Sequence, residues 1–407
     1  MIEELIIRMN KDKLILAYSG GLDTSVAIPW LKENYNAEII TVSIDLGMVN
    51  LKTITDRALA CGATKAIGID AKQEFTEEYI SKSLVAGAIY QDKYPLATAL
   101  GRPLIAKCLV DVANKENAVY IAHGCTGKGN DQVRIEVSIA ALNSNLKIIA
   151  PIREWGMSRD MELEYAKTHS LPIETKPSNF SIDENLWGRA IESGILEDPW
   201  NIPPEDAFEW TKSIEDSSDQ STEYEIYFEQ GIPKMIDSQQ MNLVEIIEFF
   251  NAKAGENGIG RIDHIEDRLV GIKSREVYEC PAAVVLHEAL SSLESLSLSK
   301  NQLRFKRQVG VEYSELVYNG LWYSHHRENL EAYLQNTQRF VTGTVKVKFH
   351  KGNCIVIGRK SKYSLYDYQL ATYDDSDSFD HKSAVGFIKI FSLPTTLQKK
   401  IQKNKDN

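Results

Sequence analysis

The sequence predicts an α/β fold made of a parallel-sheet domain at residues 1–175, a mixed α+β domain at 176–393 and a C-terminal tail at 394–407. The length of 407 residues is enough for two or three domains with their own cores. Strand and helix patterns alternate over the first part of the chain, which is typical of a parallel sheet covered on both faces. Proline, tryptophan and acidic residues then gather at 197–206 (EDPWNIPPED), where the alternation has ended.

The expected strands of the first domain are short runs of apolar and β-branched residues, as in KLILAY, and continuous apolar runs are typical of buried strands. These strands are Lys13–Tyr18, Glu38–Ile44, Thr64–Asp70, Ala118–His123 and Lys147–Ala150. The expected helices lie between them, at Thr24–Asn34, Thr53–Cys61, 72–89, Arg102–Asn117 and Val133–Asn143. Gly62 ends the second of these helices, and Pro29 is expected to kink the first.

The second domain mixes strand and helix patterns without regular alternation. We expect a strand at Tyr224–Gln230, helices at Asn242–Ala254 and Pro281–Leu296, and a hairpin that turns at Lys351 and Gly352. The hairpin strands are Thr342–Phe349 and Cys354–Gly358. The Lys-rich segment Thr396–Asn407 is expected to be a terminal helix, free or docked on another subunit.

Composition excludes several classes of protein. The net charge of −11 argues against a nucleic-acid partner, because such proteins normally carry a basic face. No stretch approaches the ~20 apolar residues of a membrane span, and the N-terminus lacks the apolar core of a secretory signal. The five cysteines form no CxxC pair, so neither a zinc ribbon nor a disulfide framework is expected, and a reducing cytoplasm is the predicted compartment.

The segment Ala17–Ser25 (AYSGGLDTS) is the most informative motif. It follows the first strand and precedes the first helix, where free N–H groups and the helix dipole favour an anion. Gly20 and Gly21 allow a tight turn and a close approach of the backbone to a ligand, while Ser19, Thr24 and Ser25 add hydroxyl donors. The alternative is an ordinary strand–turn–helix connection with Asp23 or Thr24 as N-cap.

The string SGGxDTS resembles the PP-loop of the ATP pyrophosphatases, which cleave ATP between the α- and β-phosphates. The spacing GxxxxGK[ST] of a Walker A loop and the dinucleotide fingerprint GxGxxG are both missing here. The resemblance therefore implies a nucleotide-binding domain of the adenine nucleotide alpha hydrolase type, AMP transfer and release of pyrophosphate.

Eight strings follow one another along nearly the whole chain: AYSGGLDTS (17–25), YPLATALGRPLIAK (94–107), AHGCTGKGNDQVRIE (122–136), APIREW (150–155), SIDENLWGR (181–189), LEDPW (196–200), GRIDHIEDRLVGIKSREVYE (260–279) and SLYDYQLATYD (364–374). In these strings, and over nearly its whole length, the chain resembles the argininosuccinate synthases. The order and spacing of the strings make a chance match improbable.

This resemblance implies a carbon–nitrogen ligase of arginine biosynthesis that joins citrulline and aspartate through a citrullyl-adenylate. It also implies Mg²⁺ on the ATP phosphates, a homotetramer, and an active site between the two domains. The residues implied for ATP are Ala17, Tyr18, Ser19, Gly20, Gly21, Leu22, Asp23, Thr24, Ser25 and Gly124. Those implied for citrulline are Tyr94, Asn130, Arg134, Ser181, Glu266 and Tyr278, and those for aspartate are Thr126, Asn130 and Asp131. No protein-only metal site and no general base are assigned.

The chemistry of the loop after the fourth strand suits amino-acid substrates. Thr126 and Asn130 can hydrogen-bond a carboxylate, Asp131 can pair with an ammonium group, and Arg134 can pair with a carboxylate. The alternative is a Gly-rich connection in which Asn130 or Asp131 caps the next helix. Without the resemblance, Glu266 is expected to be an exposed acid, and Tyr94 and Tyr278 to be core residues.

The sequence departs from the family pattern at three positions near these residues. Ala99 and Ala190 stand where some members carry serines that contact citrulline, and Phe180 replaces an expected tyrosine. Two competing hypotheses remain: a PP-loop enzyme that modifies tRNA, such as a thiolase or a lysidine-type synthetase, and a nucleotide-binding module without catalysis.

Overall fold

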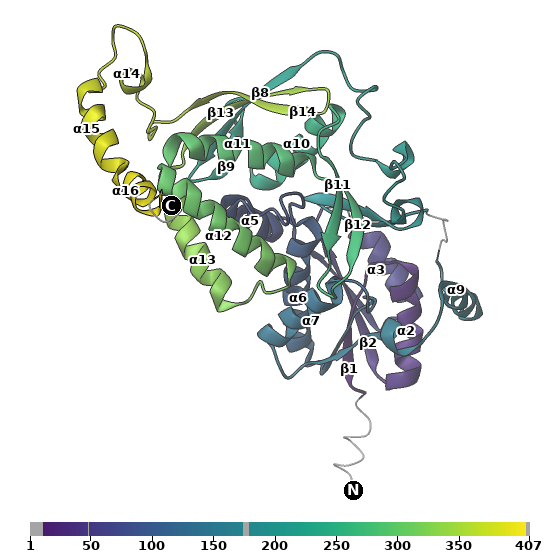
Figure 1. Ribbon diagram of the computed structural model, residues 1–407. Coiled ribbons are helices and arrows are strands. Elements are labelled where there is room, and N and C mark those ends of the chain that lie inside the picture. The colour runs from purple at the N-terminus through teal and green to yellow at the C-terminus, as the bar shows by residue number, and fades with distance from the viewer. Residues whose placement is uncertain (1–10, 48, 174–178, 404–407) are drawn as a thin grey trace. The chain divides into compact units, whose positions relative to one another are not determined.

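A computed structural model describes residues 11–47, 49–173 and 179–403 (Figure 1). The chain separates into two compact units, Met1–Tyr363 and Ser364–Asn407, and the site described below lies within the first. The expected domain boundary at 175 falls outside the described residues, as do the last four residues of the expected tail. The three expected domain ranges stay predictions.

The first half of the chain forms a five-stranded parallel sheet in the order β3-β2-β1-β4-β5, which confirms the predicted α/β fold (Figure 1). Its elements are β1 (Lys13–Ala17), α2 (Leu22–Tyr35), β2 (Glu38–Asp45), α3 (Leu51–Ala60), β3 (Lys65–Asp70), α4 (Lys72–Glu74), the π-helical η1 (Phe75–Ile80), α5 (Ser81–Ala86), α6 (Ala97–Glu116), β4 (Tyr120–Ala122), α7 (Asp131–Leu142), β5 (Lys147–Ile149), α8 (Pro151–Glu154) and α9 (Arg159–Thr168).

Side chains of β1 alternate between two apolar layers. Leu14 and Leu16 belong to the cluster that contains Ile28 of α2, whereas Ile15 belongs to the cluster that contains Leu109 of α6. Helices therefore cover both faces of the sheet. Because β1 and β4 are paired in parallel, the loops that follow them leave the same edge side by side. This adjacency brings the PP-loop next to the loop at 123–130.

The second half contains two antiparallel sheets, in the orders β10-β9-β8-β13-β14 and β11-β12-β7-β6. Its strands and short helical turns are β6 (Ser181–Asn185), β7 (Gly188–Glu192), η2 (Gly194–Glu197), η3 (Glu205–Ala207), β8 (Thr222–Glu229), β9 (Ile232–Ile236), β10 (Gln239–Gln240), β11 (Arg261–Asp267), β12 (Lys273–Glu279), η4 (Gln338–Phe340), β13 (Gly343–His350) and β14 (Asn353–Lys360). Its helices are α10 (Leu243–Glu256), α11 (Pro281–Ser297), α12 (Lys300–Tyr318) and α13 (His325–Thr337).

The second unit consists of α14 (Tyr368–Ala371), α15 (His381–Phe391) and α16 (Leu393–Gln402). In the described part of the chain, no helix is long and apolar enough to cross a bilayer.

Several expected elements differ from the observed ones. The helix expected from Arg102 begins at Ala97, and Pro103 lies inside it rather than at its start. The single helix expected at 72–89 is interrupted by the π-helical turn η1. Helix α12 was not predicted, although Ser299 and Gln302 form a capping box at its start, which is a signal that sequence carries.

Trp187 ties the second half of the chain to the first. Its ring is fully buried, and its indole Nε1 donates to the carbonyl of Pro95, 2.9 Å away. Asn185 donates from Nδ2 to the carbonyl of Ala97 at 2.8 Å. The β6–β7 hairpin is therefore anchored beside the N-terminus of α6, close to the carboxyl edge of the parallel sheet.

Candidate active site

The PP-loop turns from β1 into α2 through two glycines with different geometry. Gly20 has a φ of +81°, the left-handed region that glycine enters without steric cost. Gly21 is the N-cap of α2 with a φ of −76° and a ψ of 177°, which is ordinary extended backbone. No side chain caps this 14-residue helix, so its N-terminal N–H groups suit an anion. The alternative of Asp23 or Thr24 as N-cap is therefore wrong.

Two pairs of hydroxyl groups lie along the loop. Ser19 Oγ is 3.2 Å from Thr24 Oγ1, and Ser19 Oγ also accepts from the backbone N–H of Gly21 at 3.4 Å. Tyr18 and Ser25 form a buried pair at 2.8 Å between their hydroxyl oxygens. Ser19 and Thr24 are thus the two loop hydroxyls that lie outside this buried pair.

A cavity of about 450 Å³ lies at the carboxyl edge of the sheet beside this loop. Four members of the predicted ATP set in the PP-loop line it, namely Ala17, Tyr18, Ser19 and Thr24, and Gly124 joins them from the loop after β4. The other predicted ATP residues do not line it. These are Gly20, Gly21, Leu22, Asp23 and Ser25.

Asp23 lies close to helix α9. Burial and the charge of Asp23 raise the pKa of Glu162, in the first turn of α9, to about 7. Leu22 packs in the apolar cluster that holds Ala166 of the same helix. Leu22 therefore packs α2 against α9, and Asp23 lies near an acidic residue of the same helix.

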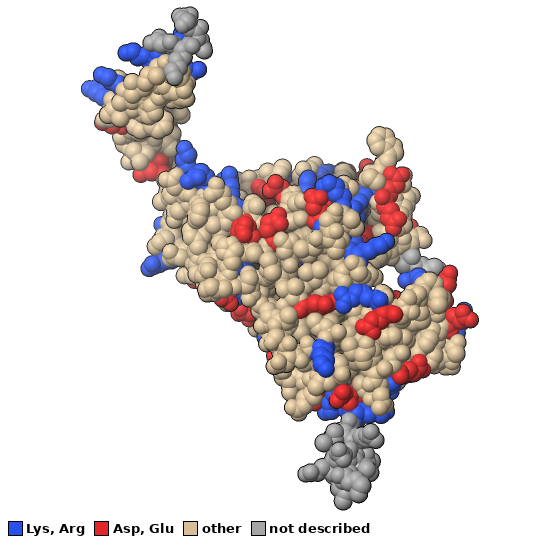
Figure 2. All heavy atoms as spheres, turned by 60° about the horizontal axis from the view of Figure 1, so that its bottom comes forward, with Lys and Arg blue, Asp and Glu red and all other residues tan. Residues whose placement is uncertain are grey.

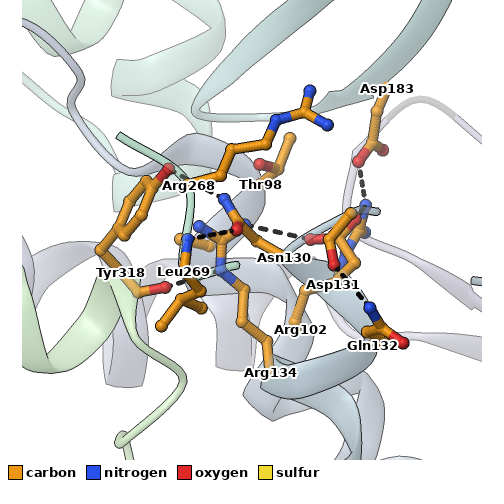
Figure 3. A network of polar contacts seen from close by, with 12 residues as sticks. Thr98, Arg102, Asn130, Asp131, Gln132, Arg134, Asp183, Arg268, Leu269 and Tyr318 are labelled. Carbon is orange, nitrogen blue, oxygen red and sulfur yellow. Dashed lines mark hydrogen bonds and ion pairs between the residues drawn. The ribbon is translucent and has the colours of Figure 1, made fainter. Parts of the chain in front are cut away.

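Asp131 is the first residue of α7 and lies between two arginines (Figure 3). Its Oδ2 is 2.7 Å from Arg102 Nη2, and its Oδ1 is 3.0 Å from Arg134 Nη1. Burial opposes ionisation, but the two guanidinium groups outweigh it and lower the pKa of Asp131 to about 2. Arg102 also pairs with Asp183 of β6, so the network joins the first half of the chain to the second.

Asn130 is held at both ends of its amide (Figure 3). Its Oδ1 accepts from the backbone N–H of Leu269 at 2.9 Å, and its Nδ2 donates to the hydroxyl of Tyr318 at 2.8 Å. The Tyr318 hydroxyl in turn donates to Glu266 Oε1 at 2.6 Å, and Tyr278 donates to Glu266 Oε2 at 2.7 Å. One chain of hydrogen bonds therefore connects four side chains from distant parts of the sequence, namely Asn130, Tyr318, Glu266 and Tyr278.

Glu266 is only 4% exposed, so the reading of an exposed acid is wrong. Strand β11 has reversed polarity: His264 and Glu266 face inward, whereas the apolar Ile265 is 44% exposed. Period-two patterning normally places apolar residues inside, and this reversal marks a strand that contributes to a polar site. The Glu266 carboxylate receives the two tyrosine hydroxyls, and its charge contributes to raising the pKa of Arg134.

Arg134 has a donor left over. Its Nε donates to the carbonyl of Tyr318 at 2.9 Å and its Nη1 pairs with Asp131, but its buried Nη2 has no hydrogen-bond partner among the described residues. A buried guanidinium donor without a partner is costly, which favours an anionic ligand at this atom.

The remaining aromatic residue of the predicted citrulline set is fully enclosed. Tyr94 stacks on Tyr278 with 4.4 Å between ring centroids, and its hydroxyl is 2.7 Å from Thr98 Oγ1. Both tyrosines line a second, smaller cavity of about 100 Å³. The other predicted citrulline residues that line it are Asn130, Arg134, Ser181 and Glu266.

The two cavities adjoin. They share a wall, and the residues common to both are Gly129, Asp131, Ser181, Asp183 and Glu192. Thr126, from the predicted aspartate set, lines the larger cavity only, and Asn130 lines the smaller one only. Every predicted citrulline and aspartate residue therefore lines at least one of the two cavities.

The three departures from the family pattern lie in different surroundings. Ala190 lines it and pairs across the sheet with Tyr278, whereas Ala99 is fully buried beside the hydroxyl of Tyr94. Phe180 packs against the apolar cluster of Ile191.

Sequence reasoning missed four residues that hold this site together. Arg102 and Asp183 lay inside strings already compared with the family, and their pairing needed the fold to be visible. Arg268 lies in the turn between β11 and β12 and contacts Glu192 and Glu276 at the smaller cavity. The sequence of this turn does not predict these contacts. Tyr318 lies at the end of α12, a helix that was not predicted.

Comparisons with known proteins identify the family of this chain. The family described as "Arginosuccinate synthase N-terminal HUP domain" matches residues 13–172, and "Arginosuccinate synthase C-terminal domain" matches 180–398. A curated argininosuccinate synthase of Symbiobacterium thermophilum is 53% identical over 400 residues, covering 98% of this chain and 100% of the relative. The argininosuccinate synthase of Bacillus thuringiensis is 54% identical and covers 98% of this chain and 99% of the relative. That of Dehalococcoides mccartyi is 52% identical and covers 96% of this chain and 97% of the relative. The chain belongs to the argininosuccinate synthase family, and it is a carbon–nitrogen ligase that uses ATP.

Proposed function

We propose that the enzyme joins L-citrulline and L-aspartate through a citrullyl-adenylate. The ureido oxygen of citrulline attacks the α-phosphorus of ATP, and the bond to the β-phosphate oxygen breaks to release pyrophosphate. The amine of aspartate then attacks the activated ureido carbon. AMP leaves with the former ureido oxygen, a proton is lost from the amine, and argininosuccinate remains.

The observation that carries this proposal is the common wall between the two cavities. Adenylation requires the ureido group and the α-phosphate to meet in a near-attack arrangement. The larger cavity holds the PP-loop hydroxyls of Ser19 and Thr24, and the smaller one holds Glu266 and Arg134. Asp131 lies in the wall between them. A nucleotide in one cavity and an amino acid in the other would therefore be neighbours.

The charges support a specific orientation of citrulline. Glu266 is a buried carboxylate that receives only tyrosine hydroxyls, so it can take the α-ammonium group. The free Nη2 of Arg134 can take the α-carboxylate. The neutral ureido group is then directed away from both, toward the common wall. We assign the phosphates of ATP to the PP-loop and the N-terminus of α2.

We assign aspartate to Thr126, Asn130 and Asp131, as the family resemblance implies. Both oxygens of Asp131 already contact arginines, so a substrate ammonium would add a third cation to a carboxylate that stays ionised. Arg102 and Arg134 also supply positive charge for the carboxylates that aspartate brings.

We propose that Mg²⁺ arrives with ATP as part of the substrate. Among the described residues, no group of three or more His, Cys, Asp or Glu side chains could hold a metal ion. Magnesium commonly binds through substrate phosphates and only one or two carboxylates, and there it neutralises phosphate charge.

We further propose a homotetramer in which the C-terminal helices contact other subunits. In α15, Phe387, Ile388 and Phe391 are each more than 60% exposed within their own unit, and so is Ile401 of α16. Such an apolar surface favours a protein partner. An Ile388→Asp variant is expected to shift the mass measured by light scattering below that of the tetramer, and an unchanged mass would contradict this assignment.

We place the enzyme in the cytoplasm, because all five of its cysteines are free thiols. On the larger part of the face seen in Figure 2, Lys and Arg are interspersed with Asp and Glu, which does not favour a polyanionic partner there.

The test is pyrophosphate release from ATP with citrulline alone, with aspartate alone and with both. We expect sustained release only with both, and argininosuccinate in equal amount. Release that requires tRNA would instead support an RNA-modifying enzyme. Nucleotide binding without release under any condition would support a module without catalysis.

A further inference from the structure

Tyr318 occupies a position between the groups assigned to the two amino-acid substrates. It is the last residue of α12, and its ring stacks on Tyr90 with 3.6 Å between centroids and a 7° angle between planes. It lines neither of the two cavities. Its effect on the reaction would have to pass through the residues that it orients.

The end of α12 holds Tyr318 against α7. The N–H of Gly320 bonds to the carbonyl of Val317, and Gly320 has a φ of +75°. A Cβ at Gly320 would lie 2.7 Å from Arg134 Cα, so glycine permits the close approach of the two segments. The Arg134 guanidinium lies 4.7 Å from the centre of the Tyr318 ring. This backbone arrangement fixes where the hydroxyl of Tyr318 points.

The hydroxyl of Tyr318 has a defined direction of hydrogen bonding. The amide nitrogen of Asn130 can only donate, and the carboxylate of Glu266 can only accept. The single hydroxyl proton therefore goes to Glu266, at 2.6 Å, and a lone pair receives Asn130, at 2.8 Å. Burial and the charge of Glu266 raise the pKa of Tyr318, so its hydroxyl keeps this proton.

This direction also determines the orientation of the Asn130 amide. The N–H of Leu269 requires an acceptor, which is Oδ1 of Asn130, 2.9 Å away. A flipped amide would set its NH₂ against the N–H of Leu269, and its oxygen against a hydroxyl whose proton belongs to Glu266. One N–H and one lone pair of Asn130 are left for ligands.

From this geometry we propose that Tyr318 is a positioning residue for both amino-acid substrates, orienting Asn130 and Glu266 through one hydroxyl. The inference rests on the proposed reaction with citrulline and aspartate. It predicts that loss of the Tyr318 hydroxyl weakens the binding of both amino acids. The binding of ATP should not change, because Tyr318 does not reach the PP-loop.

The test is Tyr318→Phe, which removes the hydroxyl and keeps the stacked ring. Tyr313→Phe is the matched control, since Tyr313 is a buried tyrosine of the same helix whose hydroxyl accepts from Arg327 at 3.3 Å, away from both cavities. A lost hydrogen bond to a charged group corresponds to about a 10- to 100-fold effect. We expect KM for citrulline and aspartate to rise by that factor in Tyr318→Phe, with KM for ATP and the unfolding midpoint close to those of the control. Equal rises for ATP, or amino-acid KM values equal to those of Tyr313→Phe, would overturn the inference.

A double-mutant cycle separates positioning from general loosening of the fold. If Tyr318 acts on aspartate through Asn130, Tyr318→Phe has little further effect on aspartate binding in an Asn130→Ala background. Independent, additive losses would overturn that route. If the wild-type enzyme itself fails to form argininosuccinate, the proposed function fails. If the wild type is active and Tyr318→Phe behaves as the control does, only this inference fails.

Discussion

Replacing Glu266 by glutamine is expected to weaken citrulline binding without destabilising the fold. The side chain is 4% exposed, and the hydrogen bonds to its carboxylate come from the hydroxyls of Tyr278 and Tyr318. A buried carboxylate whose hydrogen bonds come only from hydroxyl groups carries a desolvation cost, which the ammonium group of citrulline would offset. Glu266→Gln keeps the size of the side chain and removes the charge.

The substitution is expected to lower the affinity for citrulline but not the stability of the free enzyme. Removing one partner of a buried, hydrogen-bonded charge pair costs about 2–5 kcal/mol, which corresponds to about 30- to 4,000-fold in affinity for citrulline. The free energy of unfolding of the free enzyme should be unchanged or higher, since an amide is cheaper to bury than an isolated carboxylate.

The assay is titration calorimetry with citrulline, paired with urea unfolding of the free enzyme. Asp263→Asn is the control, because Asp263 lies on the exposed face of the same strand and pairs with Arg275. The reasoning is refuted if Glu266→Gln binds citrulline within about threefold of wild type. It is also refuted if the variant loses ~2 kcal/mol or more of stability, which would make Glu266 a structural residue.

Three further changes test other parts of the structure. Glu279 is fully buried and pairs with Arg189 at 2.9 Å, so Glu279→Ala should lower the free energy of unfolding in urea by about 3–5 kcal/mol, and a loss below ~1 kcal/mol would contradict this. Burial, together with the charge of Glu192, raises the pKa of Glu276 from 4.5 to about 7. The folded state therefore favours the protonated carboxyl group, so the folded enzyme loses stability as the pH rises from 4.5 through 7. In thermal unfolding, the midpoint of Glu276→Gln should therefore rise relative to that of the wild type between pH 5 and pH 8. A difference between the two midpoints that does not change with pH would contradict the raised pKa. Gly20→Ala should lower the free energy of unfolding in urea by about 1–2 kcal/mol, because a Cβ at positive φ is strained. The loss should exceed that of Gly21→Ala, whose φ is −76°, and equal losses would contradict this.

Sequence reasoning located the parallel sheet and its loops because local signals agree there. The apolar runs of β1 and β2 and the Gly-rich turn after β1 each predict their own structure within a few residues. The carboxyl-edge rule then places the loop after β4 beside the PP-loop. Residues such as Ser19 and Gly124 could thus be expected to lie together before the fold was known.

The second half could not be assembled in the same way. Strand β11 buries His264 and Glu266 and exposes Ile265, so its hydrophobic pattern indicates the wrong face. The contact between Tyr318 and Asn130 joins residues 188 positions apart, and no local signal encodes it. Long-range polar pairing of this kind follows from tertiary packing, whereas periodicity reports only on which face of an element is covered.

The measurement that tests the central claim most directly uses citrulline labelled with ¹⁸O in its ureido group. The enzyme is supplied with ATP and aspartate, and the products are separated and analysed by mass spectrometry. The account predicts one labelled oxygen in AMP, none in pyrophosphate, and argininosuccinate formed in equal amount. Argininosuccinate formed without labelled AMP, or with label in pyrophosphate, would contradict attack of the ureido oxygen on the α-phosphorus between the two adjoining cavities.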